Sequence, residues 1–167
     1  MRRILFLDRD GVLNRDRGEY TWRIEDFELL PGVIDGLREI SSRGYELIII
    51  TNQGGIAKGL YTHDDVDRLH AHMKSILDVE GISITEIYYC PHHPEHGKCL
   101  CRKPGSLMLE KAVARFGIDT SMSYMIGDMD RDVKAATAAG VQGILVHSNS
   151  NFIDTINKLP WNESLNS

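Results

Sequence analysis

The segment ILFLDRDG at residues 4–11 decides the fold, because an apolar run ends abruptly in two acids and a glycine. Four apolar residues without polar alternation are typical of a parallel strand that is buried on both faces. In an open α/β sheet, ligands bind at the carboxyl ends of the strands, which is where Asp8 and Asp10 lie. Two carboxylates this close repel each other unless a cation holds them, so the segment predicts an oxygen-ligated Mg²⁺ site. A strand end with two solvated acids is the simpler alternative.

Length and composition limit the class of protein. The chain has 167 residues, and we expect one domain at 1–160 followed by a frayed tail at 161–167. A net charge of −5 argues against a nucleic-acid partner. No apolar run approaches the roughly 20 residues that span a bilayer, and the N-terminus lacks the pattern of a signal peptide. We therefore expect a cytoplasmic monomer without nucleic-acid or membrane partners.

Strand-like and helix-like segments alternate along the chain. Apolar runs predict strands at 4–7, 46–50, 86–89, 123–126 and 143–146, and helical spacing predicts helices at 33–43, 62–79, 106–116, 130–139 and 151–159. This alternation with short loops predicts an α/β fold with a doubly wound, mostly parallel sheet.

Polar groups follow the second strand-like run and precede the third helix-like segment. Thr51 supplies a hydroxyl, and Asn52 and Gln53 supply amides, all of which suit phosphoryl oxygens. Gly54 lets the backbone approach a ligand closely. An ordinary strand-to-helix turn is the alternative for this stretch. Lys103 is expected to hold a transferring phosphoryl group by its positive charge, although a solvated lysine is the commoner case.

All three cysteines of the chain lie between positions 90 and 101. In a reducing compartment such a cluster indicates a metal rather than a disulfide. With one histidine they form a Cys₃His set, which is typical of structural zinc, although the spacing differs from that of common zinc fingers. The expected ligands are Cys90, His92, Cys99 and Cys101. Buried apolar cysteines or a redox trio are the alternatives. We expect the ion to rigidify the loop, with His93 and His96 as non-ligands.

Four motifs occur together in a characteristic order: DRDG at 8–11, TNQGG at 51–55, RKP at 102–104 and GDMDRD at 127–132. This set resembles the haloacid dehalogenase superfamily of aspartate-nucleophile phosphatases. The resemblance covers roughly residues 3–147 and implies a Rossmann-like sheet, a catalytic Mg²⁺ and hydrolysis of phosphomonoesters through an aspartyl-phosphate. The length between the motifs leaves no room for an inserted cap domain, so we expect a capless member with an open site.

The resemblance also implies roles for individual residues. The catalytic set that it implies is Asp8, Asp10, Thr51 and Lys103. Asp8 would be the nucleophile, and Asp10 would protonate the leaving oxygen and then activate water. Asp128 would join the Asp8 side chain and the Asp10 carbonyl around Mg²⁺. Asp132, one helical turn later, either orients the water shell of the metal or is an N-terminal acid favoured by the helix dipole. A non-catalytic binding protein of this fold would lack some of these residues.

Within the superfamily, CPHHP at 90–94 and CLCRKP at 99–104 resemble a subfamily that hydrolyses heptose bisphosphate or histidinol phosphate. The resemblance implies a small phosphorylated sugar as substrate, foremost D-glycero-D-manno-heptose 1,7-bisphosphate, which would lose its C7 phosphate. Histidinol phosphate, which the short zinc loop favours, and a broad range of sugar phosphates are the alternatives. The implied substrate-binding residues are Asp16, Arg17, Gly18, Tyr20, Asn52, Gln53, Gly54 and Arg102.

One position departs from the pattern of the heptose enzymes. Met129 stands where those enzymes typically carry a lysine that touches the substrate. The loss of that cation gives Arg102 a larger expected share in binding a remote phosphate. Arg17, Lys58 or Arg131 could substitute for the missing lysine.

Overall fold

The computed structural model describes residues 1–159 and 161. They form a five-stranded parallel sheet in the order β3-β2-β1-β4-β5. The strands are β1 (Ile4–Leu7), β2 (Glu46–Asn52), β3 (Ile84–Cys90), β4 (Tyr124–Gly127) and β5 (Gln142–Leu145). Because β1 is the middle strand, Asp8 leaves the sheet at its centre, between the ends of β2 and β4.

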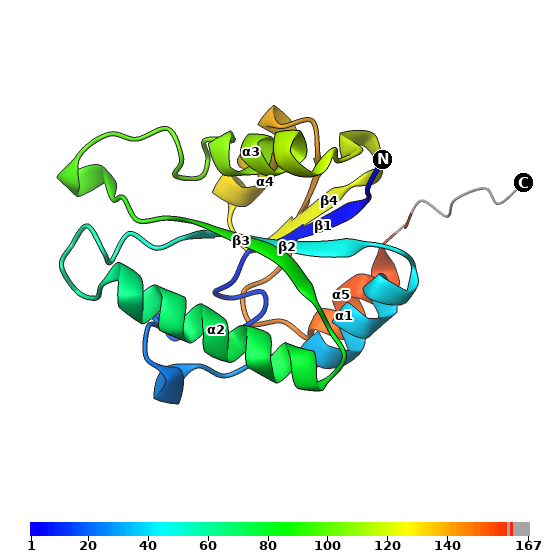
Figure 1. The fold of residues 1–167 in the computed structure, drawn as a ribbon, viewed down its shortest axis with the longest axis horizontal. Coiled ribbons are helices and arrows are strands. Elements are labelled where there is room, and N and C mark those ends of the chain that lie inside the picture. Colours follow the sequence, from blue (N-terminus) through cyan, green and yellow to red (C-terminus); the bar gives the residue numbers. More distant parts are fainter. Residues whose placement is uncertain (160, 162–167) are drawn as a thin grey trace, which may run out of the picture.

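Helices cover both faces of the sheet, as the alternating pattern predicts. They are α1 (Val33–Ser42), α2 (His63–Val79), α3 (Leu107–Phe116), α4 (Asp130–Ala138) and α5 (Phe152–Lys158). Short 3₁₀ turns lie at Ile24–Asp26, Pro94–His96 and Thr120–Met122. In Figure 1, α3 and α4 lie on one face, and α1, α2 and α5 lie on the other. The predicted doubly wound α/β fold is therefore confirmed.

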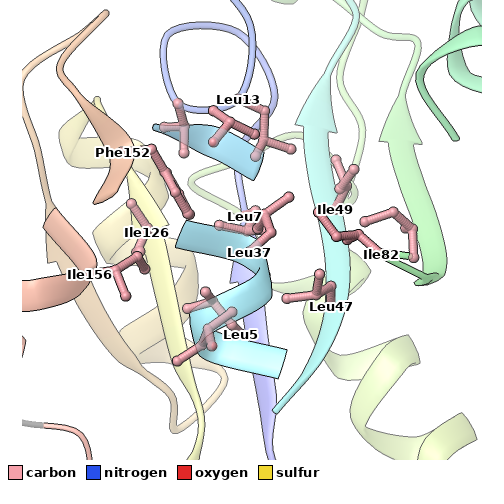
Figure 2. Close-up of a cluster of buried hydrophobic side chains, with 14 of the residues drawn as sticks. Leu5, Leu7, Leu13, Leu37, Leu47, Ile49, Ile82, Ile126, Phe152 and Ile156 are labelled. Atoms are coloured by element: carbon pink, nitrogen blue, oxygen red, sulfur yellow. The ribbon is translucent and has the colours of Figure 1, made fainter. Parts of the chain in front are cut away.

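The burial of β1 explains its unbroken apolar run. Leu5 and Leu7 point into the core on the side of α1, α2 and α5, as Figure 2 shows. Ile4 and Phe6 point to the opposite side and pack with residues of α3 and α4. All four side chains are fully buried. A polar residue at any of these positions would therefore lose its hydration, and this favours the apolar sequence.

Two strands are longer than predicted. β2 continues through Thr51 and Asn52, and β3 extends to Cys90, because Thr51 pairs with Tyr89 and Asn52 pairs with Cys90. The polar character of Thr51 and Asn52 made the strand seem to end at Ile50. The extension places the first expected zinc ligand beside the expected phosphate-binding residues, at one edge of the sheet.

The segments between the motifs contain no additional domain within the described residues. The chain from Asp10 to α1 forms a flap that carries the short turn Ile24–Asp26, and the connection from β2 to β3 is α2. The expected capless architecture is therefore confirmed. None of the helices in the described part of the chain is both long enough and apolar enough to cross a membrane.

Trp161 is the last described residue, and the remainder of the expected tail at 161–167 lies outside the described residues. Its ring lies 5.4 Å from that of Tyr45 and 5.3 Å from that of Tyr124, measured between centroids. Its indole Nε1 donates a hydrogen bond of 2.7 Å to the carbonyl of Ile156. Trp161 is 8% exposed. The position is thus the end of the packed core and not part of a frayed segment.

We expect Trp161→Ala to lower the free energy of unfolding by about 3 kcal/mol, because it removes a large buried side chain and leaves a cavity. Urea unfolding followed by circular dichroism measures the change. Val79→Ala is the control, since Val79 is 86% exposed and its truncation should cost little. A loss below about 1 kcal/mol for Trp161→Ala would show that the contact contributes little to stability.

Candidate active site

A cavity of about 130 Å³ opens at the carboxyl edge of the sheet. Asp8 enters it from the end of β1, and Asp128 enters it from the end of β4. Its lining residues are Asp8, Asp10, Asp16, Asn52, Lys103, Asp128, Met129 and Arg131. Residues that are far apart in the sequence therefore meet here because parallel strands end at the same edge.

Lys103 is the buried cation of this cavity, with 1% of its surface exposed. Its Nζ lies 2.9 Å from Oδ1 of Asp8 and 2.7 Å from Oδ1 of Asp132, and it donates to the carbonyl of Ile50 at 2.7 Å. The two carboxylates raise the pKa of Lys103 against the opposing effect of burial. The ammonium is thus kept charged beside Asp8.

Asp132 is completely buried, and both of its oxygens have a partner. Oδ1 pairs with Lys103, while Oδ2 accepts a hydrogen bond of 3.0 Å from the backbone N–H of Met129 at the start of α4. The acid therefore caps its own helix and at the same time fixes the lysine. These contacts leave it little capacity to serve as a metal ligand.

Asp8 is surrounded by excess negative charge. Burial raises its pKa to about 8; Lys103 opposes this shift, and the neighbouring carboxylates Asp132, Asp10 and Asp128 reinforce it. Burial also raises the pKa of Asp128. Single oxygens of Asp8, Asp128 and Asp132 lie within 4.8 Å of one another. With Asp132 committed to Lys103, the set fits a divalent cation held by Asp8 and Asp128, since the cation would compensate their charge.

Asp10 is held as a carboxylate by three neighbours. Burial alone would raise its pKa, but the charge of Arg9 and hydrogen bonds from Asn14, Arg9 and Gln53 outweigh burial and lower it. Nη2 of Arg9 lies 2.9 Å from Oδ1, Nδ2 of Asn14 lies 3.0 Å from Oδ1, and Nε2 of Gln53 lies 3.1 Å from Oδ2. The orientation of Asp10 is therefore fixed.

Arg9 is a functional neighbour that sequence reasoning missed. Its side chain is fully buried, donates to the carbonyl of Thr21 at 2.6 Å, and contacts Nε2 of His70 at 3.1 Å. Burial, reinforced by the charge of Arg9, lowers the pKa of His70 to about 3, so His70 is a neutral acceptor. The sequence feature that could have indicated this role is the position of Arg9 between Asp8 and Asp10, directly after a buried strand.

Gly11 allows Asp128 to approach the loop after β1. Its φ is +83°, and a Cβ at this position would lie 2.2 Å from Oδ2 of Asp128 and 2.6 Å from Oγ of Ser148. Any side chain here would displace Asp128 from the cavity. The glycine of the DRDG motif is thus required by both its backbone conformation and this close contact.

The amides expected to face a phosphate are already engaged within the protein. Nδ2 of Asn52 donates to the carbonyl of Lys103 at 3.1 Å, and its Oδ1 accepts from the N–H of Lys103 at 3.0 Å. Gln53 donates to Oγ1 of Thr51 at 3.0 Å and accepts from the hydroxyl of Tyr61 at 2.7 Å. Asn52 reaches the cavity, whereas Thr51 and Gln53 are buried behind it.

The expected substrate-binding flap reaches the cavity through one residue, Asp16. Arg17 turns away and pairs with Asp26 at 3.3 Å. Gly18 donates its N–H to Oδ1 of Asp16 at 2.9 Å. The ring of Tyr20 lies edge-on to Tyr61, at 5.8 Å between centroids. The structure therefore brings Asp16 to the cavity and uses the other three residues to shape the flap.

The Cys₃His set gathers at the end of β3. Sγ of Cys90 lies 3.7 Å from Sγ of Cys99 and 2.9 Å from Sγ of Cys101. Nδ1 of His92 lies 3.4 Å from Sγ of Cys90 and 3.2 Å from Sγ of Cys101. Ligands on a tetrahedral zinc are separated by about 3.5–3.8 Å, given bonds of ~2.0–2.3 Å. The four donors thus converge on one point and have the chemistry of a zinc site, and all of these distances except that between Cys90 and Cys99 are shorter than they would be around a bound ion.

Arg102 lies between this cluster and the loop after β2. Its Nη1 donates to the carbonyl of His92 at 3.0 Å, and it stands 3.0 Å from the position of a Cβ on Gly54. Arg102 lines a second hollow of about 460 Å³, together with Lys98 and Lys103. Because Lys103 borders both spaces, this hollow is a neighbour of the cavity that holds Asp8 and Asp10.

Comparisons with known proteins agree with this arrangement. A HAD-hydrolase-like family model matches residues 100–163. The D-glycero-β-D-manno-heptose-1,7-bisphosphate 7-phosphatase of Haemophilus ducreyi is 42% identical over 147 residues, which are 84% of this chain and 80% of that protein. The corresponding β-anomer enzyme of Escherichia coli K12 is 43% identical over 143 residues, 82% of this chain and 74% of that protein.

Two further matches extend the comparison. An α-anomer 7-phosphatase from Burkholderia mallei is 42% identical over 145 residues, covering 83% of this chain and 76% of that protein. A similar solved structure is that of the D,D-heptose 1,7-bisphosphate phosphatase from B. bronchiseptica in complex with magnesium and phosphate. The two structures superpose with a TM-score of 0.82 at 30% sequence identity, and the match covers 96% of this chain and 89% of that chain. The chain therefore belongs to the haloacid dehalogenase-like hydrolases, in the family of the heptose-1,7-bisphosphate 7-phosphatases.

Proposed function

We propose that this protein hydrolyses the C7 phosphate of D-glycero-D-manno-heptose 1,7-bisphosphate. The observation that carries the chemistry is the placement of Asp8 beside the buried Lys103 and the oriented Asp10 in one cavity. The names of the relatives supply the substrate class, since the enzymes from Haemophilus ducreyi and Escherichia coli act on this bisphosphate. A cytoplasmic location and a monomeric state remain predictions.

In the proposed first step, a carboxylate oxygen of Asp8 attacks the phosphorus. A bond forms between that oxygen and phosphorus, and the bond between phosphorus and the sugar oxygen breaks. Lys103 offsets the negative charge of the phosphoryl oxygens, and its own position is fixed by Asp132 and by the backbone clamp of Asn52. Thr51, buried behind the cavity, would act indirectly by accepting a hydrogen bond from Gln53, which in turn orients Asp10.

Asp10 would take up a proton from solvent water as the phosphate binds, and would then give this proton to the departing sugar oxygen. Its lowered pKa leaves it anionic before the substrate binds, and the like charge of an arriving phosphate raises its affinity for a proton. In the second step, Asp10 takes a proton from the water that attacks the phosphorus of the acyl-phosphate. This step releases inorganic phosphate and restores Asp8.

We assign the divalent site to the side chains of Asp8 and Asp128 and the backbone carbonyl of Asp10. When bound there, Mg²⁺ would neutralise charge on the phosphoryl oxygens and on the crowded carboxylates. For the sugar, we propose contacts from Asp16 and Arg102, with Asn52 at the cavity wall. Arg17, Gly18, Tyr20, Gln53 and Gly54 would act indirectly, by shaping the flap and the loop after β2.

The proposed substrate predicts a clear order of rates. With Mg²⁺, kcat/KM should be highest for heptose 1,7-bisphosphate, and both anomers should be compared because the relatives include enzymes named for each. Histidinol phosphate and fructose 1,6-bisphosphate are the competing substrates. Phosphorus NMR of the product should show loss of the C7 phosphate and retention of the C1 phosphate. Faster hydrolysis of histidinol phosphate would overturn the proposed substrate.

Asp8→Asn should reduce kcat at least about 100-fold, a barrier increase of at least ~2.7 kcal/mol, because an amide cannot form the acyl-phosphate. Steady-state rates on p-nitrophenyl phosphate measure this loss without reference to the natural substrate. Asp35→Asn is the matched control, since the side chain of Asp35 is 77% exposed. If Asp8→Asn retained more than a hundredth of the wild-type kcat with an intact fold, Asp8 would not be the nucleophile.

We further propose that Cys90, His92, Cys99 and Cys101 hold one structural Zn²⁺. Burial and the neighbouring Cys101 raise the pKa of the Cys90 thiol, and a bound cation would reverse this by stabilising the thiolate. The ion would fix the loop that leads from Cys101 directly into Arg102 and Lys103. Zinc would thus support catalysis without touching the substrate.

Purified protein should contain about one zinc per chain, measured by elemental analysis. His92→Ala should lower this content, whereas His96→Ala should not, since His96 lies in the same loop but outside the set. Removal of zinc with a chelator should reduce activity while the circular dichroism of the sheet and helices persists. Wild-type protein made with ample zinc but containing none would refute the proposed site.

A further inference from the structure

One positively charged side chain of the cavity, that of Arg131, has no role in the proposed reaction. Arg131 is the second residue of α4 and lines the 130 Å³ cavity together with Asp8, Asp128 and Lys103. It also borders a neighbouring hollow that Asp128, Met129 and Leu145 line and that Asp8 and Asp10 do not reach. Arg131 is thus placed between the reacting centre and solvent, where the far end of a bound substrate would lie.

The other candidate cations near the site are already engaged. Arg17 pairs with Asp26 and Glu19. Lys58 lies over the ring of Tyr20 and 3.8 Å from Glu95. Arg102 donates to the carbonyl of His92 and borders the neighbouring hollow. Within residues 1–159 and 161, by contrast, the side chain of Arg131 has neither a hydrogen bond nor an ion pair.

The position of Arg131 is not explained by the stability of α4. A cation in the first turn of a helix meets the positive end of the helix dipole, which favours acids instead. The neighbouring first-turn acids, Asp130 and Asp132, follow that rule, and Asp132 caps the helix. An unpaired guanidinium at this point therefore costs some helix stability, and a bound anion would compensate for it.

We propose that Arg131 binds the phosphate that is not transferred, and so determines the preference for a bisphosphorylated sugar. This inference rests on the proposed function. The planar guanidinium can donate two parallel hydrogen bonds to phosphate oxygens, a geometry that a lysine cannot supply. Met129, the neighbouring side chain of the cavity wall, is uncharged and 47% exposed. The wall formed by the start of α4 therefore depends on Arg131 for its positive charge.

The test compares two substrates that differ by one phosphate: heptose 1,7-bisphosphate and heptose 7-phosphate. Arg131→Gln should lower kcat/KM for the bisphosphate about 10- to 100-fold, mainly through KM, and leave the value for the monophosphate within about twofold. Arg131→Lys should restore part of the loss. Lys134→Gln removes the same charge from an exposed position on the same helix and should change neither value.

Two results would overturn the inference. An equal loss on both substrates would mean that Arg131 only balances the charge of the cavity carboxylates. No loss on either substrate, together with a selective loss for Arg102→Gln, would place the far phosphate at the neighbouring hollow instead. If the wild type hydrolyses p-nitrophenyl phosphate but not the heptose bisphosphate, the proposed substrate fails separately. The test is then made with fructose 1,6-bisphosphate and fructose 6-phosphate. The measured quantity is kcat/KM for the bisphosphate divided by kcat/KM for the monophosphate. If Arg131→Gln leaves this ratio unchanged, the inference is also overturned.

Discussion

The contact on which the site depends is the burial of one ammonium group between two carboxylates and a backbone carbonyl. Lys103 joins Asp8 after β1, Ile50 in β2 and Asp132 in α4. A buried charge without partners is strongly destabilising, so each of these segments must be in place for the others to be stable there. The position of Asp8, the proposed nucleophile, is therefore linked to completion of the sheet.

The residues that hold Lys103 and Asp10 in place are themselves fixed by hydrogen bonds. Asn52 clamps the main chain of Lys103 from one side, and the Cys₃His cluster begins at Cys90, the residue paired with Asn52 in the sheet. The extension of β2 and β3 beyond their expected ends makes this arrangement possible. Arg9 has a similar role. It donates a hydrogen bond to Asp10, and its own guanidinium is held by the carbonyl of Thr21 and the ring of His70.

The sequence predicted the sheet and much of the cavity for a physical reason. Apolar runs mark strands buried on both faces, and parallel strands deliver the residues after them to one edge, so Asp8 and Asp128 could be expected to meet. The sequence could not predict that Asn52 and Gln53 hydrogen-bond to other groups of the protein. An amide after a strand can bind either a ligand or the protein's own backbone and side chains. Arg9 was missed because a charged side chain is seldom buried without a visible partner. Trp161 was missed because its partners, Tyr45 and Tyr124, are distant in the sequence.

The central place of β1 also has a consequence for how the chain is made. Its two neighbours are β2 and β4, and the pairing of Leu5 with Tyr124 joins residues that are far apart in the sequence. A ribosome that adds about 5–20 residues per second delivers β4 seconds after β1, so the first strand synthesised waits with one edge unpaired. During that interval a wholly apolar strand, Ile4–Leu7, is exposed to other nascent chains. Closure by β4 ends this exposure and, in the same event, brings Asp128 to Asp8.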